Sequence, residues 1–341
     1  MMKRIITLIA AATAVASLTF AAKTIPAYAQ IAGKSTQMYT YEEMEKDLKE
    51  ITGEYPQLTE LSSLGTTVDG RRIYCLRIGP ADARKKVLFN ASIHAREYIT
   101  TESLMLQTYE YLDNIRNKVS YKGRSYADMA NDTAVYVVPM INPDGVTISQ
   151  LGMDGLRYQS TRAGIYKIYE LDRAVELAPY LRSWKSNAEG IDVNRQFDAL
   201  WEKYNDRVGH PSSDHYKGTA PATTAEAKAM IELTEKTGFD RTVSYHTQGQ
   251  VVYWYFGQEG KLYDDTKALA EAIGNVTGYK LDANYQNLDP AGYKDWAISK
   301  KGIPSLTIEV GTGGNPVDHA QLSEIVKQNR YVFAETILSM D

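Results

Sequence analysis

The sequence predicts a single α/β domain in which a mixed, mostly parallel twisted sheet is flanked by helices. Strand-like apolar runs alternate along the chain with segments of helical periodicity, which is the pattern of α/β proteins. The chain also has no internal repeat, no low-complexity tract and no Pro- or Gly-rich linker. Nothing therefore divides it into two domains.

Short apolar runs supply the predicted strands, and apolar residues at helical spacing supply the predicted helices. The strands are 73–78, 87–93, 134–140, 241–245, 251–256 and 305–310. The helices are 40–52, 99–117, 222–237, 261–277 and 321–339. Residues 146–217 show few clear elements, and so long an excursion in a compact domain is usually functional. We expect this stretch to form the rim of a site.

The first element in chain order is a predicted secretory signal peptide over residues 1–29. Lys3 and Arg4 precede an apolar stretch from Ile5 to Ala22, and Ala27-Tyr28-Ala29 is a small-x-small cleavage site. The apolar stretch approaches membrane-spanning length, so an N-terminal anchor is the alternative, which the cleavage site disfavours. No later segment is apolar enough to span a membrane. We expect an exported bacterial protein, in the wall, periplasm or medium, with no membrane insertion after cleavage.

Charge and cysteine content exclude two classes of function. The chain has 42 acidic and 38 basic residues, a net charge of −4, and loss of Lys3, Arg4 and Lys23 with the signal gives −7. Because the sequence lacks an excess of basic residues, we expect no nucleic-acid partner. We also expect a monomer. Cys75 is the only cysteine, so no internal disulfide can form. It lies in the alternation of strand 73–78, which favours a buried structural thiol over a nucleophile.

The strand 87–93 ends in His94-Ala95-Arg96-Glu97. Helical spacing begins at Thr100, so Glu97 falls in the first turn of a helix and His94 just before it. Both side chains can then face one point. An imidazole and a carboxylate are zinc ligands, and together they supply two of the three protein ligands that a catalytic zinc needs.

A third ligand must come from the remaining histidines. His246 ends the predicted strand 241–245, so it emerges at the carboxyl edge of the sheet, where open α/β sheets place their ligands. His210 and His215 lie in a polar loop, and His319 lies beside a helix start. We expect these three at the surface.

Zinc-assisted hydrolysis also needs a general base, and Glu309 is the candidate. It interrupts the apolar end of the predicted strand 305–310. A buried lone acid needs a compensating charge, which a zinc and water system would supply. The alternative is that Glu309 faces solvent at the end of its strand, and the pattern alone is equally compatible with that.

Five short motifs match those of one known family in order and context. They are His94-Ala95-Arg96-Glu97, Asn142-Pro143-Asp144-Gly145, Asp192-Val193-Asn194-Arg195, Ser244-Tyr245-His246-Thr247 and Thr307-Ile308-Glu309. Over residues 38–340 the chain resembles the zinc carboxypeptidases of the carboxypeptidase A type, the M14 metallopeptidases. The resemblance implies a zinc carboxypeptidase-like sheet flanked by helices, one zinc ion, and hydrolysis of a peptide bond near a free carboxyl end.

The resemblance also implies roles for individual residues. It makes His94, Glu97 and His246 the zinc ligands. Glu309 becomes the base that takes a proton from the attacking water and returns it to the leaving amine.

Further residues of the chain resemble the family's substrate contacts. Asn194 and Arg195 resemble the pair that grips the substrate carboxylate, for which a guanidinium fork is suited. Arg96 resembles a further cationic contact along the substrate.

Two positions depart from the family pattern. Where the digestive enzymes carry an arginine after a tryptophan to stabilise the oxyanion, this chain has Lys185, which keeps the charge but loses the fork. Arg182 is an alternative for that role. The mobile tyrosine of the family most resembles Tyr285, although the loop that follows it is longer here.

The choice of substrate depends on the pocket for the terminal side chain. Lys294 falls where the resemblance places the floor of that pocket, and a cation there would favour a negatively charged group. An ordinary surface lysine is the alternative. Residues 184–197, 292–296 and 308–311 most resemble bacterial γ-D-glutamyl-diamino acid peptidases, which cut the stem peptides of peptidoglycan. A diaminopimelate side chain ends in a carboxylate and an ammonium, so Lys294 is compatible with it.

We therefore expect a secreted zinc peptidase that acts on peptidoglycan stem peptides at the γ-D-glutamyl-diaminopimelate bond. A general metallocarboxypeptidase is an alternative with the same chemistry, and a related amidohydrolase of non-peptide acylamino acids is a further alternative. A catalytically silent cell-wall-binding module is an alternative of another class. The filled ligand and base positions disfavour that last alternative.

Overall fold

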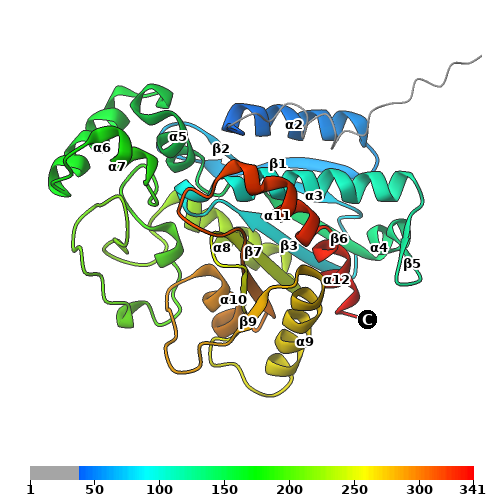
Figure 1. Ribbon diagram of the computed structural model, residues 1–341. Helices are drawn as coiled ribbons and strands as arrows, with labels where there is room; N and C mark the ends of the chain where they lie inside the picture. Colours follow the sequence, from blue (N-terminus) through cyan, green and yellow to red (C-terminus); the bar gives the residue numbers. More distant parts are fainter. Residues whose placement is uncertain (1–37) are drawn as a thin grey trace, which may run out of the picture.

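The computed structural model describes residues 38–341, and an eight-stranded twisted sheet runs through its centre (Figure 1). The predicted signal peptide lies outside the described residues. In spatial order the strands are β1 (Thr59–Thr66), β2 (Arg72–Ile78), β6 (Thr133–Val138), β3 (Lys85–Ala91), β7 (Arg241–His246), β10 (Ser305–Glu309), β8 (Val251–Tyr253) and β9 (Lys280–Asp282). The pairs β6–β3, β3–β7, β7–β10 and β8–β9 are parallel, and the other three pairs are antiparallel.

Helices bury both faces of this sheet. One face packs against α2 (Tyr41–Glu54), α3 (Ile99–Arg116), α4 (Tyr126–Asp132), α9 (Gly260–Thr277), α11 (Leu322–Asn329) and α12 (Val332–Leu338). The other face packs against α8 (Ala225–Thr237) and α10 (Tyr293–Lys301). The alternation of strand side chains divides β3 between the layers, since Val87 and Phe89 face one layer and Leu88 the other. Apolar residues on both faces explain why β3 and β6 read as nearly continuous apolar runs.

A third group of helices extends the domain beyond one end of the sheet. It consists of α5 (Pro143–Leu151), α6 (Gln159–Leu171) and α7 (Leu177–Arg182), which pack around Ile148, Ile165 and Trp184. The expectation of few elements in 146–217 is therefore wrong for its first half. These helices are short, and the first of them begins in an Asn-Pro-Asp-Gly sequence that is typical of turns. The second half is mostly irregular and borders the site described below.

Further differences from the predicted elements include the strands at the edges of the sheet and a break in one predicted helix. The edge strands β1 and β9 carry few apolar residues and gave no strand signal. A small hairpin of β4 (Ser120–Tyr121) and β5 (Arg124–Ser125) was also not predicted. The predicted helix 321–339 is two helices, α11 and α12, separated at residues 330–331. Cys75 is buried in β2 as expected, and burial raises the pKa of its thiol to about 12.

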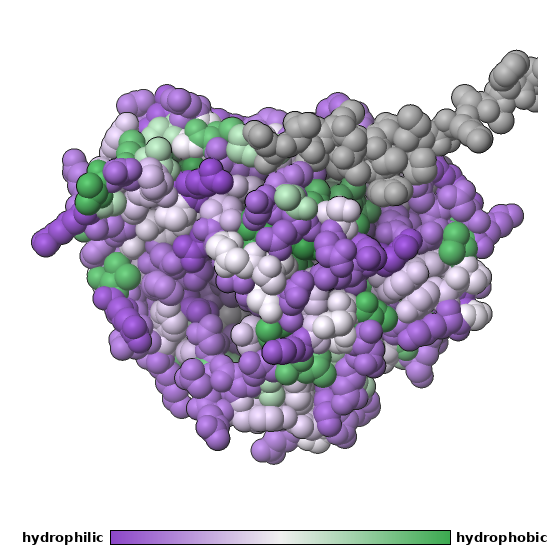
Figure 2. Space-filling model, viewed as in Figure 1, coloured by the Kyte–Doolittle hydropathy of each residue, from purple (hydrophilic) through white to green (hydrophobic). Residues whose placement is uncertain are grey.

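The surface of the domain is polar. Figure 2 shows mostly hydrophilic residues on the viewed face, with apolar residues scattered among them. Within residues 38–341, every helix is too short or too polar to cross a bilayer.

Candidate zinc and substrate site

Three parallel strands bring the candidate catalytic residues to one edge of the sheet. His246 is the last residue of β7 and pairs in register with Glu309, the last residue of β10. On the other side of β7, Ala91 at the end of β3 pairs with Tyr245, and His94 follows three residues later. The carboxyl ends of parallel strands meet at one edge, as the sequence predicted.

A tight turn after β3 aims His94 and Glu97. Ser92 has a positive φ of 48°, which is uncommon for a residue with a Cβ. Its backbone N–H donates to Thr100 Oγ1 at 3.1 Å, and its hydroxyl lies 2.7 Å from that of Thr101. The first residues of α3 thus hold the turn in place. A short 3₁₀ turn at Ala95–Glu97 then carries Glu97 round beside His94.

His94, Glu97 and His246 form one compact, buried cluster. Glu97 Oε1 lies 2.8 Å from His94 Nδ1, and Glu97 Oε2 lies 3.0 Å from His246 Nδ1. The two Nδ1 atoms lie 3.1 Å apart. One ligand atom from each residue lies within 4.8 Å of the others. Two imidazoles and a carboxylate are the donor set of a catalytic zinc with an open position, so these residues fit the ion.

The electrostatics of the cluster suit a cation. Burial opposes ionisation of Glu97, but His94 and His246 outweigh it and hold the pKa of Glu97 well below its usual range. Asp192 lies behind the cluster, with its Oδ1 3.4 Å from Nε2 of His94. A carboxylate in that position fixes the orientation of a ligating imidazole. Asp192 belongs to a motif noted in the sequence, but sequence reasoning gave it no role.

Glu309 lies at the same edge of the sheet and lines the cleft in front of the cluster. It is half-buried, so the structure does not show the freely solvated side chain of the alternative interpretation. Burial raises the pKa of Glu309 to about 8, and the nearby charges of Glu97 and Asp289 act in the same direction against the opposing effect of His246. A nearby cation would favour the carboxylate form that a general base requires.

Lys185 and Arg96 belong to one network of ion pairs beside the cluster. Lys185 Nζ lies 3.0 Å from Asp192 Oδ2 and 3.2 Å from Asp214 Oδ1, and Arg96 Nη2 lies 3.1 Å from Asp214 Oδ2. The backbone also joins the two segments, because Ala95 N donates to Lys185 O at 3.0 Å. Asp214 has no counterpart in the sequence predictions, since an acid in a polar loop gives no signal.

Asn194 and Arg195 also line the cleft. Asn194 Oδ1 accepts a hydrogen bond from Tyr293 N at 3.0 Å, which leaves its NH₂ group to donate elsewhere. Arg195 Nη2 contacts Asp289 Oδ2 at 2.7 Å. The nearby Asp192 and Asp289 outweigh burial and raise the pKa of Arg195. Asp289 is a second residue that sequence reasoning missed.

The two remaining predicted substrate contacts, Lys294 and Tyr285, lie in different places relative to the cleft. Lys294 lines the cleft, where it is paired with Asp295 and lies over the Phe256 ring. Tyr285 does not line the cleft, and its side chain is exposed. The Tyr285 ring packs 4.5 Å from that of Tyr255, and its hydroxyl lies 3.0 Å from that of Tyr263. The cleft itself has a volume of about 390 Å³.

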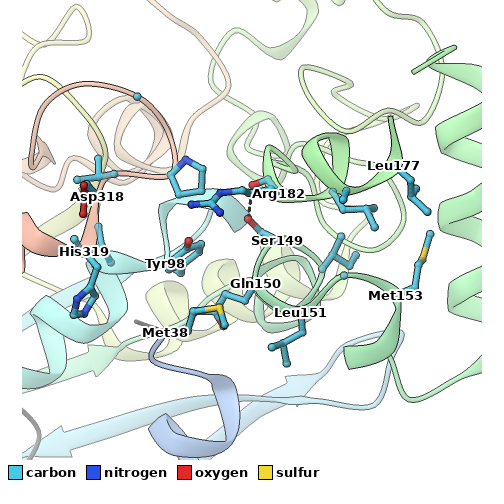
Figure 3. A pocket seen from close by; sticks show the side chains of 18 of the residues that line it. Met38, Tyr98, Ser149, Gln150, Leu151, Met153, Leu177, Arg182, Asp318 and His319 are labelled. Atoms are coloured by element: carbon cyan, nitrogen blue, oxygen red, sulfur yellow. Dashed lines mark hydrogen bonds between the residues drawn. The ribbon is translucent and has the colours of Figure 1, made fainter. Parts of the chain in front are cut away.

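A second, larger hollow of about 1110 Å³ lies next to the site, between α5, α7 and the loop after β10 (Figure 3). Arg182, the alternative to Lys185, lines this hollow together with Tyr98. Of the two candidates for the oxyanion, only Lys185 lines the cleft that holds His94, Glu97 and His246. His319 lines the second hollow as well, while His215 is exposed and His210 half-buried.

Comparison with known proteins defines the class of this protein. The family model for zinc carboxypeptidases, peptidase family M14, matches residues 44–332, so the chain belongs to that family. It is a zinc-dependent metallopeptidase, and the family resemblance and fold class predicted from the sequence are confirmed.

The relatives include a γ-D-glutamyl-diamino acid endopeptidase and several carboxypeptidases. The γ-D-glutamyl-L-diamino acid endopeptidase 1 of Lysinibacillus sphaericus is 32% identical over 298 residues, which cover 87% of this chain and 72% of that protein. Carboxypeptidase B of Astacus astacus is 24% identical over 298 residues, which cover 82% of this chain and 88% of that protein.

Solved structures agree in fold at lower identity. Bovine thrombin-activatable fibrinolysis inhibitor superposes with a TM-score of 0.67 at 17% identity, covering 89% of this chain and 97% of that one. Carboxypeptidase A of Helicoverpa armigera superposes with a TM-score of 0.64 at 17% identity, covering 92% of this chain and 77% of that one.

Proposed function

We propose that this protein is an exported zinc peptidase that hydrolyses the γ-D-glutamyl-diaminopimelate bond of peptidoglycan stem peptides. The observation that carries the proposal is that Arg195 and Lys294, two nearly buried cations besides Lys185, line the cleft beside a cluster that fits one zinc ion. Diaminopimelate has two carboxylates, and a guanidinium and an ammonium are suited to hold them. The relative from Lysinibacillus sphaericus, whose name specifies such a bond, supports the same substrate class.

In this proposal the ion is held by His94, Glu97 and His246. Zinc, when bound there, acidifies water and polarises the carbonyl. Glu309 takes a proton from the attacking water and delivers it to the leaving amine. Lys185 donates to the oxygen on which negative charge develops, and its contacts with Asp192 and Asp214 hold the ammonium in place.

The remaining cleft residues hold the substrate. Asn194 and Arg195 bind a carboxylate of the departing residue, Lys294 binds the second carboxylate, and Arg96 contacts the acyl part. Tyr285 would join them only if its loop moved toward the cleft. A general carboxypeptidase is the second candidate, because Asn194 and Arg195 would serve any free carboxyl end equally well.

The test is to incubate purified protein with muropeptides and with peptides of varied C-terminal residue, with and without chelator, and to identify the products by mass. Chelator-sensitive release of diaminopimelate-containing fragments supports the proposal. Efficient cleavage of ordinary peptides with intact muropeptides would favour the general carboxypeptidase.

The role of Glu309 is tested by Glu309→Gln. We expect hydrolysis to fall by about a thousandfold or more, because the base is lost, while bound zinc measured by metal analysis stays near one equivalent. Glu324→Gln, on the exposed side of α11, is the matched control and should keep full activity. Near-normal activity of Glu309→Gln would contradict the assignment.

A further inference from the structure

Asp289 is an acidic residue in the same cleft whose cations, Arg195 and Lys294, are proposed to bind the carboxylates of the substrate. It lies in the loop between β9 and α10 and lines the cleft with Arg195. Its Oδ2 lies 2.7 Å from Arg195 Nη2, and its side chain is 65% exposed whereas that of Arg195 is only 9% exposed. The other carboxylate oxygen of Asp289 accepts no hydrogen bond within the described part of the chain. One oxygen therefore remains available to a ligand.

This pairing changes what Arg195 can accept. A substrate that brings only a carboxylate would place that carboxylate and Asp289 at one guanidinium. Two like charges so close together are unfavourable. A substrate that brings a carboxylate and an ammonium leaves each charge with a partner: the carboxylate on Arg195 and the ammonium on Asp289. The cleft thus favours a ligand that carries both charges.

Asp289 is the acid in the cleft with the freedom to take that role. Asp295 also lies there, but Lys294 occupies one of its oxygens and the N–H of Gly292 donates to the other at 3.2 Å. Asp295 is almost fully buried in the first turn of α10. Glu97 and Glu309 belong to the proposed catalytic residues.

We propose that Asp289 is a specificity-determining residue that receives the free ammonium group of a diamino acid while Arg195 and Lys294 hold its carboxylates. This inference rests on the proposed function, since it concerns the residue released by the same site. It assigns the preference for a diamino acid to one side chain in a loop.

The experiment compares substrates that differ only in that ammonium. One pair ends in diaminopimelate or 2-aminopimelate, and the other ends in lysine or norleucine, each attached to γ-D-glutamate. In Asp289→Asn we expect kcat/KM to fall about tenfold for diaminopimelate and lysine, as for the loss of one close charge pair. Values for 2-aminopimelate and norleucine should stay level or rise, because Arg195 is freed. Asp264→Asn, an exposed acid on α9, is the matched control.

The readout is the ratio within each pair. Asp289 also contributes to the raised pKa of Glu309, so its removal can change all four rates together. An equal change for all four substrates, or none, would overturn the inference. The same four residues attached to an N-acylated alanine separate this inference from the proposed function. If Asp289→Asn lowers kcat/KM selectively for the ammonium-bearing members of that set, while no γ-D-glutamyl substrate is cleaved, the role of Asp289 is supported and the proposed function is refuted.

A binding measurement keeps the test independent of turnover. In the Glu309→Gln background, calorimetry with free diaminopimelate and free 2-aminopimelate should show a preference for the first of about tenfold. Adding Asp289→Asn should abolish that preference. An unchanged preference in the double variant would overturn the inference.

Discussion

At the scale of single residues, the site depends on ion pairs that the protein forms within itself. Lys185 is held by Asp192 and Asp214, Arg195 by Asp289, and Lys294 by Asp295. Lys185 is buried, yet its acidic neighbours outweigh burial and raise the pKa of its ammonium, so the charge is retained. A charged donor that is already oriented needs little reorganisation when negative charge develops on a substrate oxygen.

The oxyanion role can be assigned by comparing two variants. Lys185→Ala should lower kcat by about a hundredfold to a thousandfold with a smaller effect on KM, as for the loss of one oxyanion donor. Arg182→Ala should change kcat by about twofold at most, because Arg182 lies in the neighbouring hollow. Steady-state kinetics with one peptide substrate measures both. The reverse ranking would transfer the role to Arg182.

At the scale of elements, the segment 184–195, which ends in a 3₁₀ turn at Val193–Arg195, is held against the first turn of α8. Asn187 in this segment donates through Nδ2 to Glu226 Oε2 at 3.1 Å, and its Oδ1 accepts from the N–H groups of Glu189 and Ile191. Glu226 is fully buried, and burial raises its pKa from an ordinary 4.5 to about 7, with smaller contributions of the same sign from Asp144 and Glu189. A carboxyl that binds its proton up to about pH 7 therefore lies beneath the segment that carries Lys185 and Arg195.

This arrangement predicts a pH-dependent stability. The folded state favours the protonated acid, so the destabilisation from Glu226 is absent below pH 4.5, grows between pH 4.5 and 7, and is complete above pH 7. Glu226→Gln removes the charge and keeps an acceptor for Asn187. It should raise the free energy of unfolding at pH 8 by at most about 3 kcal/mol and have little effect at pH 4.5. Urea denaturation at both pH values measures it, and an equal effect at both would contradict the buried acid.

Periodicity in the sequence predicted the strands that hold the proposed site residues, because β3 reads as a nearly continuous apolar run and β7 and β10 alternate apolar with polar residues. It did not predict β1 at the polar edge of the sheet, nor α5, which begins with the turn-like Asn142-Pro143. At the site, strand ends indicated His94, His246 and Glu309. Asp289 and Asp214 could not be predicted, since a loop acid gains a role only from the cation that the fold places beside it.

At the scale of the whole molecule, the candidate metal cluster lies at the edge of a sheet that has its own core. One apolar layer packs on β3, β7 and β10, the other packs on β3, and both extend well beyond His94, Glu97 and His246. Cys75 is the only cysteine and is buried, so no internal disulfide adds to this stability. Small metal-dependent domains unfold without their ion because they have no such core. This domain should keep its fold when the ion is removed.

Removal of zinc should therefore abolish hydrolysis without unfolding the protein. Chelation is expected to leave the circular dichroism spectrum native and to lower the melting temperature by about 10 °C, since an ion bound at a thousandfold excess over its Kd contributes about 4 kcal/mol. Added zinc should restore both activity and melting temperature. His246→Ala is the matched control, and its melting temperature should respond far less to zinc because one ligand is missing. Loss of the native spectrum on chelation would show that the metal supports the fold, whereas full activity in chelator would remove zinc from the reaction.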